Sequence, residues 1–207
     1  YESMLGRLPW KTLGLRPARD EAGECLWYAV SGVHKDASLV RAEMLNTDSA
    51  GLFEVFAPDG VTPIAGIVPA SRAVAVVFAP GDALPGQARN HLGTGVEHCD
   101  GSYGASAYLD NDGTINNAVV SGAPDAIDRF INDGAVGNDQ VLVITRDELA
   151  AAIEARNDLR SDLQNLLAAA AACIADYGLN NPGGPTDRRL PWPAPANLTH
   201  YRRCHLH

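Results

Sequence analysis

The chain has 207 residues, which is enough for one domain or one domain with an appendage, because domains average about 150 residues. Apolar residues make up 46% of the sequence and charged residues 20%, which excludes collagen-like, coiled-coil and wholly disordered classes. Sixteen Lys and Arg stand against 25 Asp and Glu, giving a net charge of −9. The sequence therefore offers no basic surface for nucleic acid or anionic lipid.

Residues 1–24 are predicted to form loops and turns, because Pro9, Gly14 and Pro17 interrupt every hydrophobic period. The first residues include no initiator Met, no basic stretch and no apolar stretch, so we expect the chain to begin downstream of a removed segment. The longest apolar run, 166–175, is shorter than the roughly 18 to 20 residues that cross a bilayer. The sequence thus predicts no membrane-spanning segment.

Five segments have the aromatic and β-branched content of strands: 26–31, 52–57, 73–79, 117–121 and 141–145. The segment 73–79 contains no polar residue, which predicts a central strand covered on both faces. Residues 80–139 are rich in Gly, Asn, Asp and Ser, so we expect a large surface excursion with a short helix at 124–132. These elements predict an α+β fold with a mainly antiparallel sheet and long irregular loops.

One long helix is predicted over 146–177. It follows the capping-box pattern of Thr145 and Glu148, and apolar residues recur every three or four positions as far as Tyr177. Gly178 is a natural C-cap, and the polar stretch 156–158 is a point at which the helix can break or bend. The predicted organisation is a sheet domain at 1–145 with its 80–139 excursion, an amphipathic helix at 146–178, and an extended Pro-rich tail at 179–207.

Two parts of the chain resemble a known family. The segment 7–10 (Arg-Leu-Pro-Trp), followed by Asp20, Gly23, Leu26 and Tyr28, is similar to the turn and first strand of type IV pilin-like proteins and type II secretion pseudopilins. In this chain Glu and Ala at 21–22 replace the Pro and Trp of the family turn. The segments 75–81 and 138–146 resemble a group of uncharacterised prepilin-like bacterial proteins, so the resemblance covers residues 5 to 150.

The resemblance implies a pilin-like globular domain. Proteins of this family are made with an apolar N-terminal helix, are cleaved by a prepilin peptidase, and assemble through that helix into a filament or its tip. The family start and its apolar helix are absent from these residues. The resemblance implies other pilin or pseudopilin subunits as partners, self-association, a membrane contact only through the missing helix, and a periplasmic or cell-surface location.

Four cysteines, Cys25, Cys99, Cys173 and Cys204, are widely separated and form no C-x-x-C motif, which argues against a zinc ribbon or a thioredoxin-like site. Four cysteines allow three pairings, and their even number favours an oxidising compartment. We expect Cys25 to pair with Cys99, which attaches the long excursion to the first predicted strand. Cys173 is expected to pair with Cys204, which ties the tail to the helix.

The segment 110–116 places oxygen side chains around a Gly turn, as short calcium loops do. Asp110, Asp112 and Asn116 are therefore candidate calcium ligands. An ordinary Asp-Gly β-turn with solvated side chains explains the same pattern. Trp10, Trp27 and Trp192 are possible glycan platforms, although Trp27 alternates with its neighbours as a core residue does.

No sequence pattern of an enzyme is present, since the chain lacks a nucleophile elbow and a phosphate-binding glycine loop. We therefore expect a non-catalytic protein without catalytic or cofactor-binding residues, calcium aside. The predicted function is that of a structural subunit or minor component of a type IV pilus or type II secretion pseudopilus. The alternative is a secreted binding module for calcium or glycan.

Overall fold

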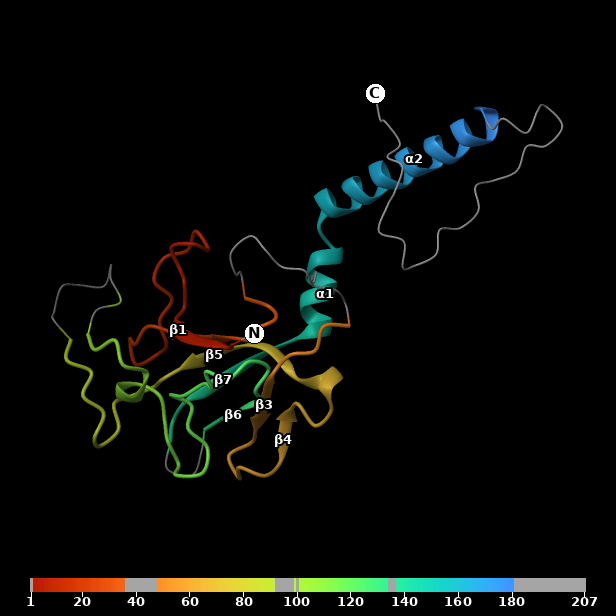
Figure 1. The fold of residues 1–207 in the computed structure, drawn as a ribbon. Coiled ribbons are helices and arrows are strands. Elements are labelled where there is room, and N and C mark those ends of the chain that lie inside the picture. The colour runs from red at the N-terminus through yellow and green to blue at the C-terminus, as the bar shows by residue number, and fades with distance from the viewer. Residues whose placement is uncertain (1, 36–47, 92–98, 100, 134–136, 181–207) are drawn as a thin grey trace. The chain divides into compact units, whose positions relative to one another are not determined.

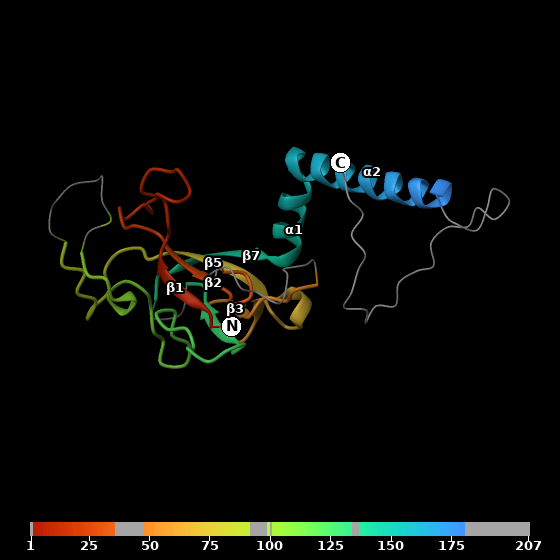
Figure 2. The ribbon, with the colours of Figure 1, turned by 45° about the horizontal axis from the view of Figure 1, so that its top comes forward.

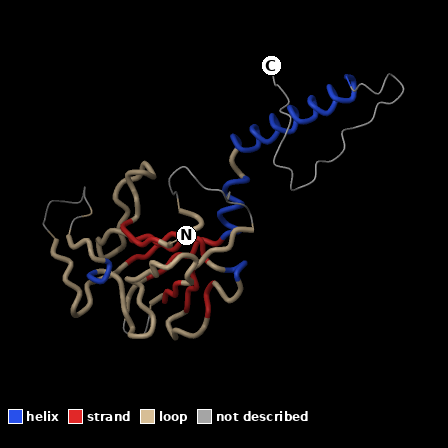
Figure 3. Tube along the Cα trace, in the orientation of Figure 1, coloured by secondary structure: helices blue, strands red, loops and turns tan. Residues whose placement is uncertain are grey.

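A computed structural model of the chain describes residues 2–35, 48–91, 99, 101–133 and 137–180 (Figure 1). The chain divides into two compact units, Tyr1–Ala150 and Ala151–His207. The first unit contains the sheet, and Figure 3 shows its strands gathered together with long loops around them.

Seven strands form one sheet in the described residues. They are β1 (Met4–Arg7), β2 (Trp27–Val30), β3 (Phe53–Phe56), β4 (Pro63–Ala65), β5 (Ala73–Ala79), β6 (Asp128–Ile131) and β7 (Gln140–Thr145). The order is β1-β2-β5-β3-β4, with β7 paired to β5 and β6 paired to β3. Every pairing is antiparallel except that of β3 with β6. Together with two α helices, this mostly antiparallel sheet fits the predicted α+β class.

Four of the five predicted strands are confirmed, at β2, β3, β5 and β7. The prediction of a strand at 117–121 is wrong, because Asn117 uses its side chain, not its backbone, to pair with β6. The predicted helix at 124–132 is also wrong, since 128–131 is the parallel strand β6. The N-terminal loop prediction misses β1, which contains a glycine and only four residues.

The core lies on one side of the sheet and is built around aromatic rings. Phe130 of β6 is fully buried and meets the rings of Phe53 and Phe78 edge-on, with centroids 5.2 and 5.0 Å apart. Trp27 packs against Tyr108 at 5.5 Å between centroids, and both side chains are buried. Edge-to-face pairs like those of Phe130 stabilise a core by about 0.5–1.5 kcal/mol beyond their area burial. The position of Trp27 confirms the core interpretation of that residue.

Three edges of the sheet are protected from pairing with another strand. The amide of Asn117 bonds both the N–H and the C=O of Ile131 at 2.9 Å and so occupies the free edge of β6. On β7, the N–H of Val141 donates to Asn132 Oδ1, and that of Thr145 donates to Glu148 Oε2, both at 2.8 Å. The strand β4 has only three residues and begins with a proline. Side chains and Pro at these places are the usual means of preventing edge-to-edge association.

The predicted long helix is two helices, α1 (Arg146–Glu154) and α2 (Asn157–Asn180). The capping box is confirmed, because Glu148 N donates to Thr145 Oγ1 at 3.3 Å while Glu148 Oε2 accepts from Thr145 N. The helix breaks where the polar stretch was expected to allow it. Gly178 does not end α2, which continues for two more residues. The predicted Pro-rich tail lies outside the described residues from 181 onward.

Candidate functional site

The strand register divides β1, β2, β5 and β7 into two faces, because residues paired across a sheet point to the same side. Arg7, Trp27, Phe78 and Val141 form one row across the four strands, on the core side. Gly6, Tyr28, Val77 and Leu142 form the next row and point to the other side. In Figure 2, β2 lies between β1 and β5, with β7 next to them. The side that points away from the core is the second face of these four strands.

This face is apolar and open. We call it the outer sheet face and define it by Met4, Tyr28, Val30, Val77, Leu142 and Ile144. Leu142 is 65% exposed and Met4 53%, while the other four side chains are half-buried. Burial raises the pKa of the Tyr28 hydroxyl above its ordinary value. At its border, a hollow of about 410 Å³ next to Val77 and Leu142 is also lined by the polar residues Asn132, Asp133 and Gln140.

The absence of charge on this face is unusual. Its two rows, Met4–Val30–Ala75–Ile144 and Gly6–Tyr28–Val77–Leu142, contain no ionisable group other than the phenol. Antiparallel sheets that face water on one side normally carry polar residues there. The continuous apolar run of β5 predicted coverage on both faces, yet Val77 and Ala79 are only partly covered. The sequence predicts these strands, except β1, but not this surface.

The predicted calcium residues have other roles. Asp110 is 5% exposed, and its Oδ2 accepts from the N–H groups of Asn138 and Asp139 at 2.5 and 2.8 Å. Asp112 Oδ1 accepts from the backbone at Thr114 and Ile115, which closes the Asp-Gly turn. Asn116 Oδ1 accepts from Ala118 N at 2.9 Å. Among the described residues no cluster of three or more His, Cys, Asp or Glu is placed to hold a metal ion.

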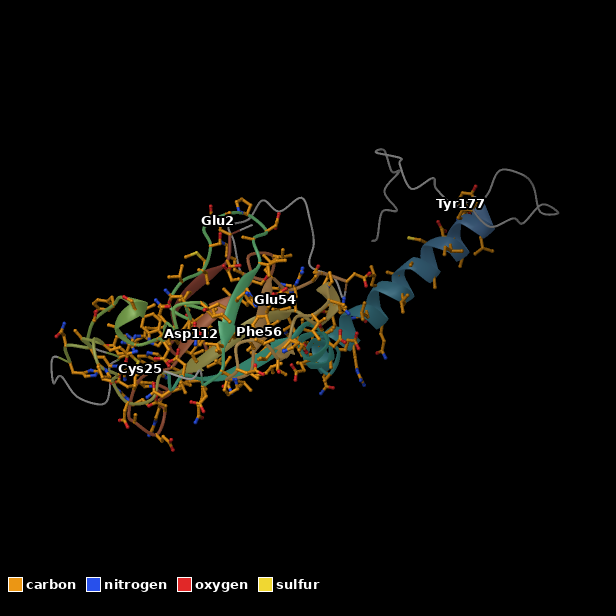
Figure 4. All side chains as sticks on the ribbon, turned by 90° about the horizontal axis from the view of Figure 1, so that it is seen from below. Glu2, Cys25, Glu54, Phe56, Asp112 and Tyr177 are labelled. Carbon is orange, nitrogen blue, oxygen red and sulfur yellow. A yellow bond between two sulfur atoms is a disulfide. The ribbon has the colours of Figure 1, made fainter. Side chains whose placement is uncertain are left out.

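The segment 110–116 therefore forms an ordinary Asp-Gly turn, which is the alternative that the sequence left open. It differs from that alternative in the side chain of Asp110, which is buried and not solvated. Its Oδ1 accepts from Gln87 Nε2 at 3.2 Å, so both oxygens serve protein donors. A Cβ on Gly137 would overlap Asp110 Oδ2, which explains a glycine at that position. Asp112 is labelled in Figure 4, where it lies in the sheet unit. A calcium site at these residues remains a prediction without geometric support.

Asp139 is the most unusual ionisable group of the buried network. Its side chain is fully buried, and Oδ2 accepts from Asp110 N and Asn117 Nδ2, both at 2.8 Å, while Oδ1 has no hydrogen-bond partner. Desolvation raises the pKa of this carboxyl to about 7, and the neighbouring Asp110 carboxylate adds to the rise. The two hydrogen bonds and Arg89 act in the opposite direction. The network holds residues 110 and 117 against 138–139, so its role is structural.

The raised pKa of Asp139 predicts a specific pH dependence. A carboxyl whose folded pKa exceeds its unfolded value contributes stability below the unfolded pKa, near 4, and loses it as pH rises through about 7. The wild type therefore loses stability between pH 4 and pH 7 as Asp139 ionises, whereas Asp139→Asn does not. The unfolding free energy of the variant relative to the wild type should rise over this range by a few kcal/mol at most. Urea titrations at several pH values measure it. A difference independent of pH would contradict the assignment.

A second buried polar cluster joins the first strand region to the excursion. Arg89 is 5% exposed, lies 3.1 Å from Glu24 Oε1 through Nη1, and donates from the same nitrogen to Gly81 O at 2.6 Å. His91 Nε2 lies 2.9 Å from the same Glu24 oxygen. The Tyr108 hydroxyl donates to Arg89 O at 3.1 Å. Because its hydrogen bonds and its ion pair all go to protein groups, we assign Arg89 to positioning the loop.

The expected disulfide between Cys25 and Cys99 is confirmed, with Cα atoms 5.7 Å apart. Cys25 is buried two residues before β2 and is labelled in Figure 4. The expected pair of Cys173 with Cys204 lies in part outside the described residues. A disulfide that closes so long a loop indicates a compartment in which disulfides form, outside the reducing cytoplasm.

Helix α2 is exposed along most of its length. Leu166 and Leu167 are 65% and 68% exposed, and Tyr177, labelled in Figure 4, is 45% exposed. It contains no buried residue. Within the described part of the chain, no helix has the length and apolarity needed to span a bilayer.

Comparison with known proteins identified no relative: no protein family, no curated protein and no solved structure matches the chain.

Proposed function

We propose that this chain is a non-catalytic structural subunit, or a minor component, of a type IV pilus or a type II secretion pseudopilus, and that it presents its sheet unit outside the cytoplasm. The outer sheet face is the observation that carries the proposal. Four strands present an apolar surface without a charged side chain, and Leu142 at its edge is 65% exposed. A surface of this kind marks a contact with another protein.

The energetics favour an occupied face. Complete burial of a Leu or Met side chain stabilises a contact by about 1.5–3 kcal/mol relative to leaving it in water. Leu142 and Met4 have much of that area still exposed, and the half-buried Val and Ile side chains add to it. A second apolar surface, on α2, includes Leu163, Leu166 and Ile174. Two exposed apolar surfaces on one chain support the proposal that the protein works in an assembly.

The remaining features agree with this role. The Cys25–Cys99 disulfide supports a location outside the cytoplasm. The net charge of −9 disfavours nucleic acid and anionic lipid as partners. The alternative, a secreted module for calcium or glycan, has less support. Asp110 is occupied by protein donors, and Trp27, at 2% exposure, cannot stack on a sugar.

Substitution of Leu142 tests the proposal. Leu142→Asp places a charge on the outer sheet face and should abolish concentration-dependent self-association, because a buried unpaired carboxylate costs several kcal/mol. Since Leu142 is 65% exposed, the monomer should keep its stability within about 0.5 kcal/mol. Sedimentation velocity over a wide concentration range measures association, and thermal melts measure stability.

Ile67→Asp is the matched control, because Ile67 is 76% exposed in the loop after β4 and is not part of the outer sheet face. It should associate as the wild type does. The Leu166→Asp variant tests, in the same experiment, whether the apolar surface of α2 contributes to self-association. A wild type that stays monomeric at every concentration, or a Leu142→Asp variant that associates as the control does, would refute the assembly role of this face.

A further inference from the structure

The edge of β1 differs from the other edges of the sheet. Among the described strands, β1 pairs only with β2. Leu8 N donates to Leu26 O at 3.0 Å, so the alternation of an antiparallel ladder turns the backbone groups of Leu5 and Arg7 away from β2. The strand β4 is short, and side chains bond the edges of β6 and β7. By contrast, no described side chain bonds the outward backbone groups of Leu5 and Arg7. The edge of β1 is open to a further strand.

A groove runs along this open edge. Leu5, Arg7 and Trp27 form one wall, and Tyr103, Ala118 and Val120 form the other, around a volume of about 410 Å³. Tyr103 is 87% exposed at its rim. Because Leu5 and Arg7 point to the core side of the sheet, the groove is separate from the outer sheet face. Its lining combines the apolar side chains of Leu5, Ala118 and Val120 with the cationic side chain of Arg7.

Among the described residues, Arg7 contacts aromatic rings and carbonyl oxygens. Its guanidinium carbon lies 4.1 Å from the Tyr108 ring centroid and 4.7 Å from that of Trp27. Its Nη1 and Nη2 donate to Cys25 O and Ser102 O at 3.3 and 3.5 Å, which are long hydrogen bonds, and Nε has no partner. No carboxylate of the described residues forms an ion pair with it. The indole Nε1 of Trp27, a 2% exposed side chain in the same wall, also lacks an acceptor.

We propose that the groove binds an extended peptide segment of a partner protein, which pairs with the outer edge of β1 and directs a carboxylate side chain to Arg7. Main-chain pairing gives such complexes their affinity, and pockets for alternate side chains give their specificity. Side chains opposite Leu5 and Arg7 point into the groove, so the segment carries an apolar residue and, two positions away, an acidic one. A carboxylate supplies the charged acceptor that no described residue provides to Arg7, in a charge-assisted hydrogen bond.

The test uses a short strand peptide, acetyl-Thr-Val-Thr-Glu-Thr-amide, titrated into the full chain by calorimetry. We expect saturable binding, at least fivefold tighter than that of the same peptide with Gln in place of Glu. N-methylation of one amide that faces β1 should weaken binding at least tenfold, while N-methylation of the next amide, which faces away, should leave it unchanged. Absence of saturable binding, or equal affinity of the Glu and Gln peptides, would overturn the proposal.

Variants assign the binding to this groove. Arg7→Gln should remove the preference for Glu, with an unchanged melting temperature as evidence of folding. Because Arg7 also contacts Trp27 and Tyr108, Tyr103→Ala provides an independent variant that leaves the core intact and should weaken both peptides at least threefold. Free glutarate separates strand pairing from simple anion binding. Glutarate that binds as tightly as the peptide, or a Tyr103→Ala variant with unchanged affinity, would overturn strand pairing in this groove.

Discussion

Removal of the disulfide, by replacing Cys25 and Cys99 with alanine, should lower the free energy of unfolding by about 4 kcal/mol, since the bond closes a loop between positions 74 residues apart. Without the bond, the unfolded chain gains the conformational freedom that the cross-link had removed. Cys25 is also buried, so its substitution leaves a small cavity beside β2. The loss is a large share of the 5–15 kcal/mol typical of a domain.

Urea titration of the wild type and of the double variant measures this loss. The wild type treated with a reductant is the natural control, because it keeps both cysteines and lacks only the bond. It should be destabilised nearly as much as the double variant. A double variant within about 1 kcal/mol of the oxidised wild type would show that the excursion is held by its hydrogen bonds alone, such as that from Gly81 N to Asp20 Oδ2 at 2.8 Å.

The second large effect concerns Phe130. Its ring is fully buried between Phe53 and Phe78, so Phe130→Ala should cost about 3–5 kcal/mol through lost transfer free energy and a residual cavity. Chemical denaturation measures the cost. Ile127→Ala, in the loop before β6 at a side chain 43% exposed, is the matched control and should cost less than about 1 kcal/mol. Equal costs would mean that Phe130 is not at the centre of the core.

The strands that the sequence predicts correctly are those with dense apolar and aromatic content. The strand β5 has seven consecutive apolar residues, and its bounds agree with the prediction. The strand β1 is missed because its sequence, Met-Leu-Gly-Arg, is short and contains a glycine. The strand β6 is missed because Asp128 and Arg129 begin it. Asp128 is held there by a hydrogen bond that its Oδ1 accepts from Ser121 N at 2.6 Å. Such a contact is tertiary and leaves no local pattern.

The candidate surfaces were harder to predict than the fold. An apolar strand has the same sequence pattern whether its second face is covered by its own chain or by a partner. The exposure of Leu142 therefore had no signal in the sequence. The calcium pattern lacks geometric support for a related reason. Asp110 and Asp112 have the spacing of ligands, but long-range contacts to 138–139 decide where the Asp110 carboxylate points. The Cys25–Cys99 pair was predictable because cysteine number and loop position restrict the choices.

We expect the outer sheet face to be covered when the protein assembles. The most direct test is thiol labelling of Leu142→Cys and, in a separate protein, Ile67→Cys, read by peptide mass spectrometry at each position. Dilute protein should be labelled at both positions, because both side chains are largely exposed. In concentrated, associated protein, labelling at 142 should slow at least tenfold while labelling at 67 stays the same. Equal labelling rates at position 142 in dilute and associated protein would contradict the account.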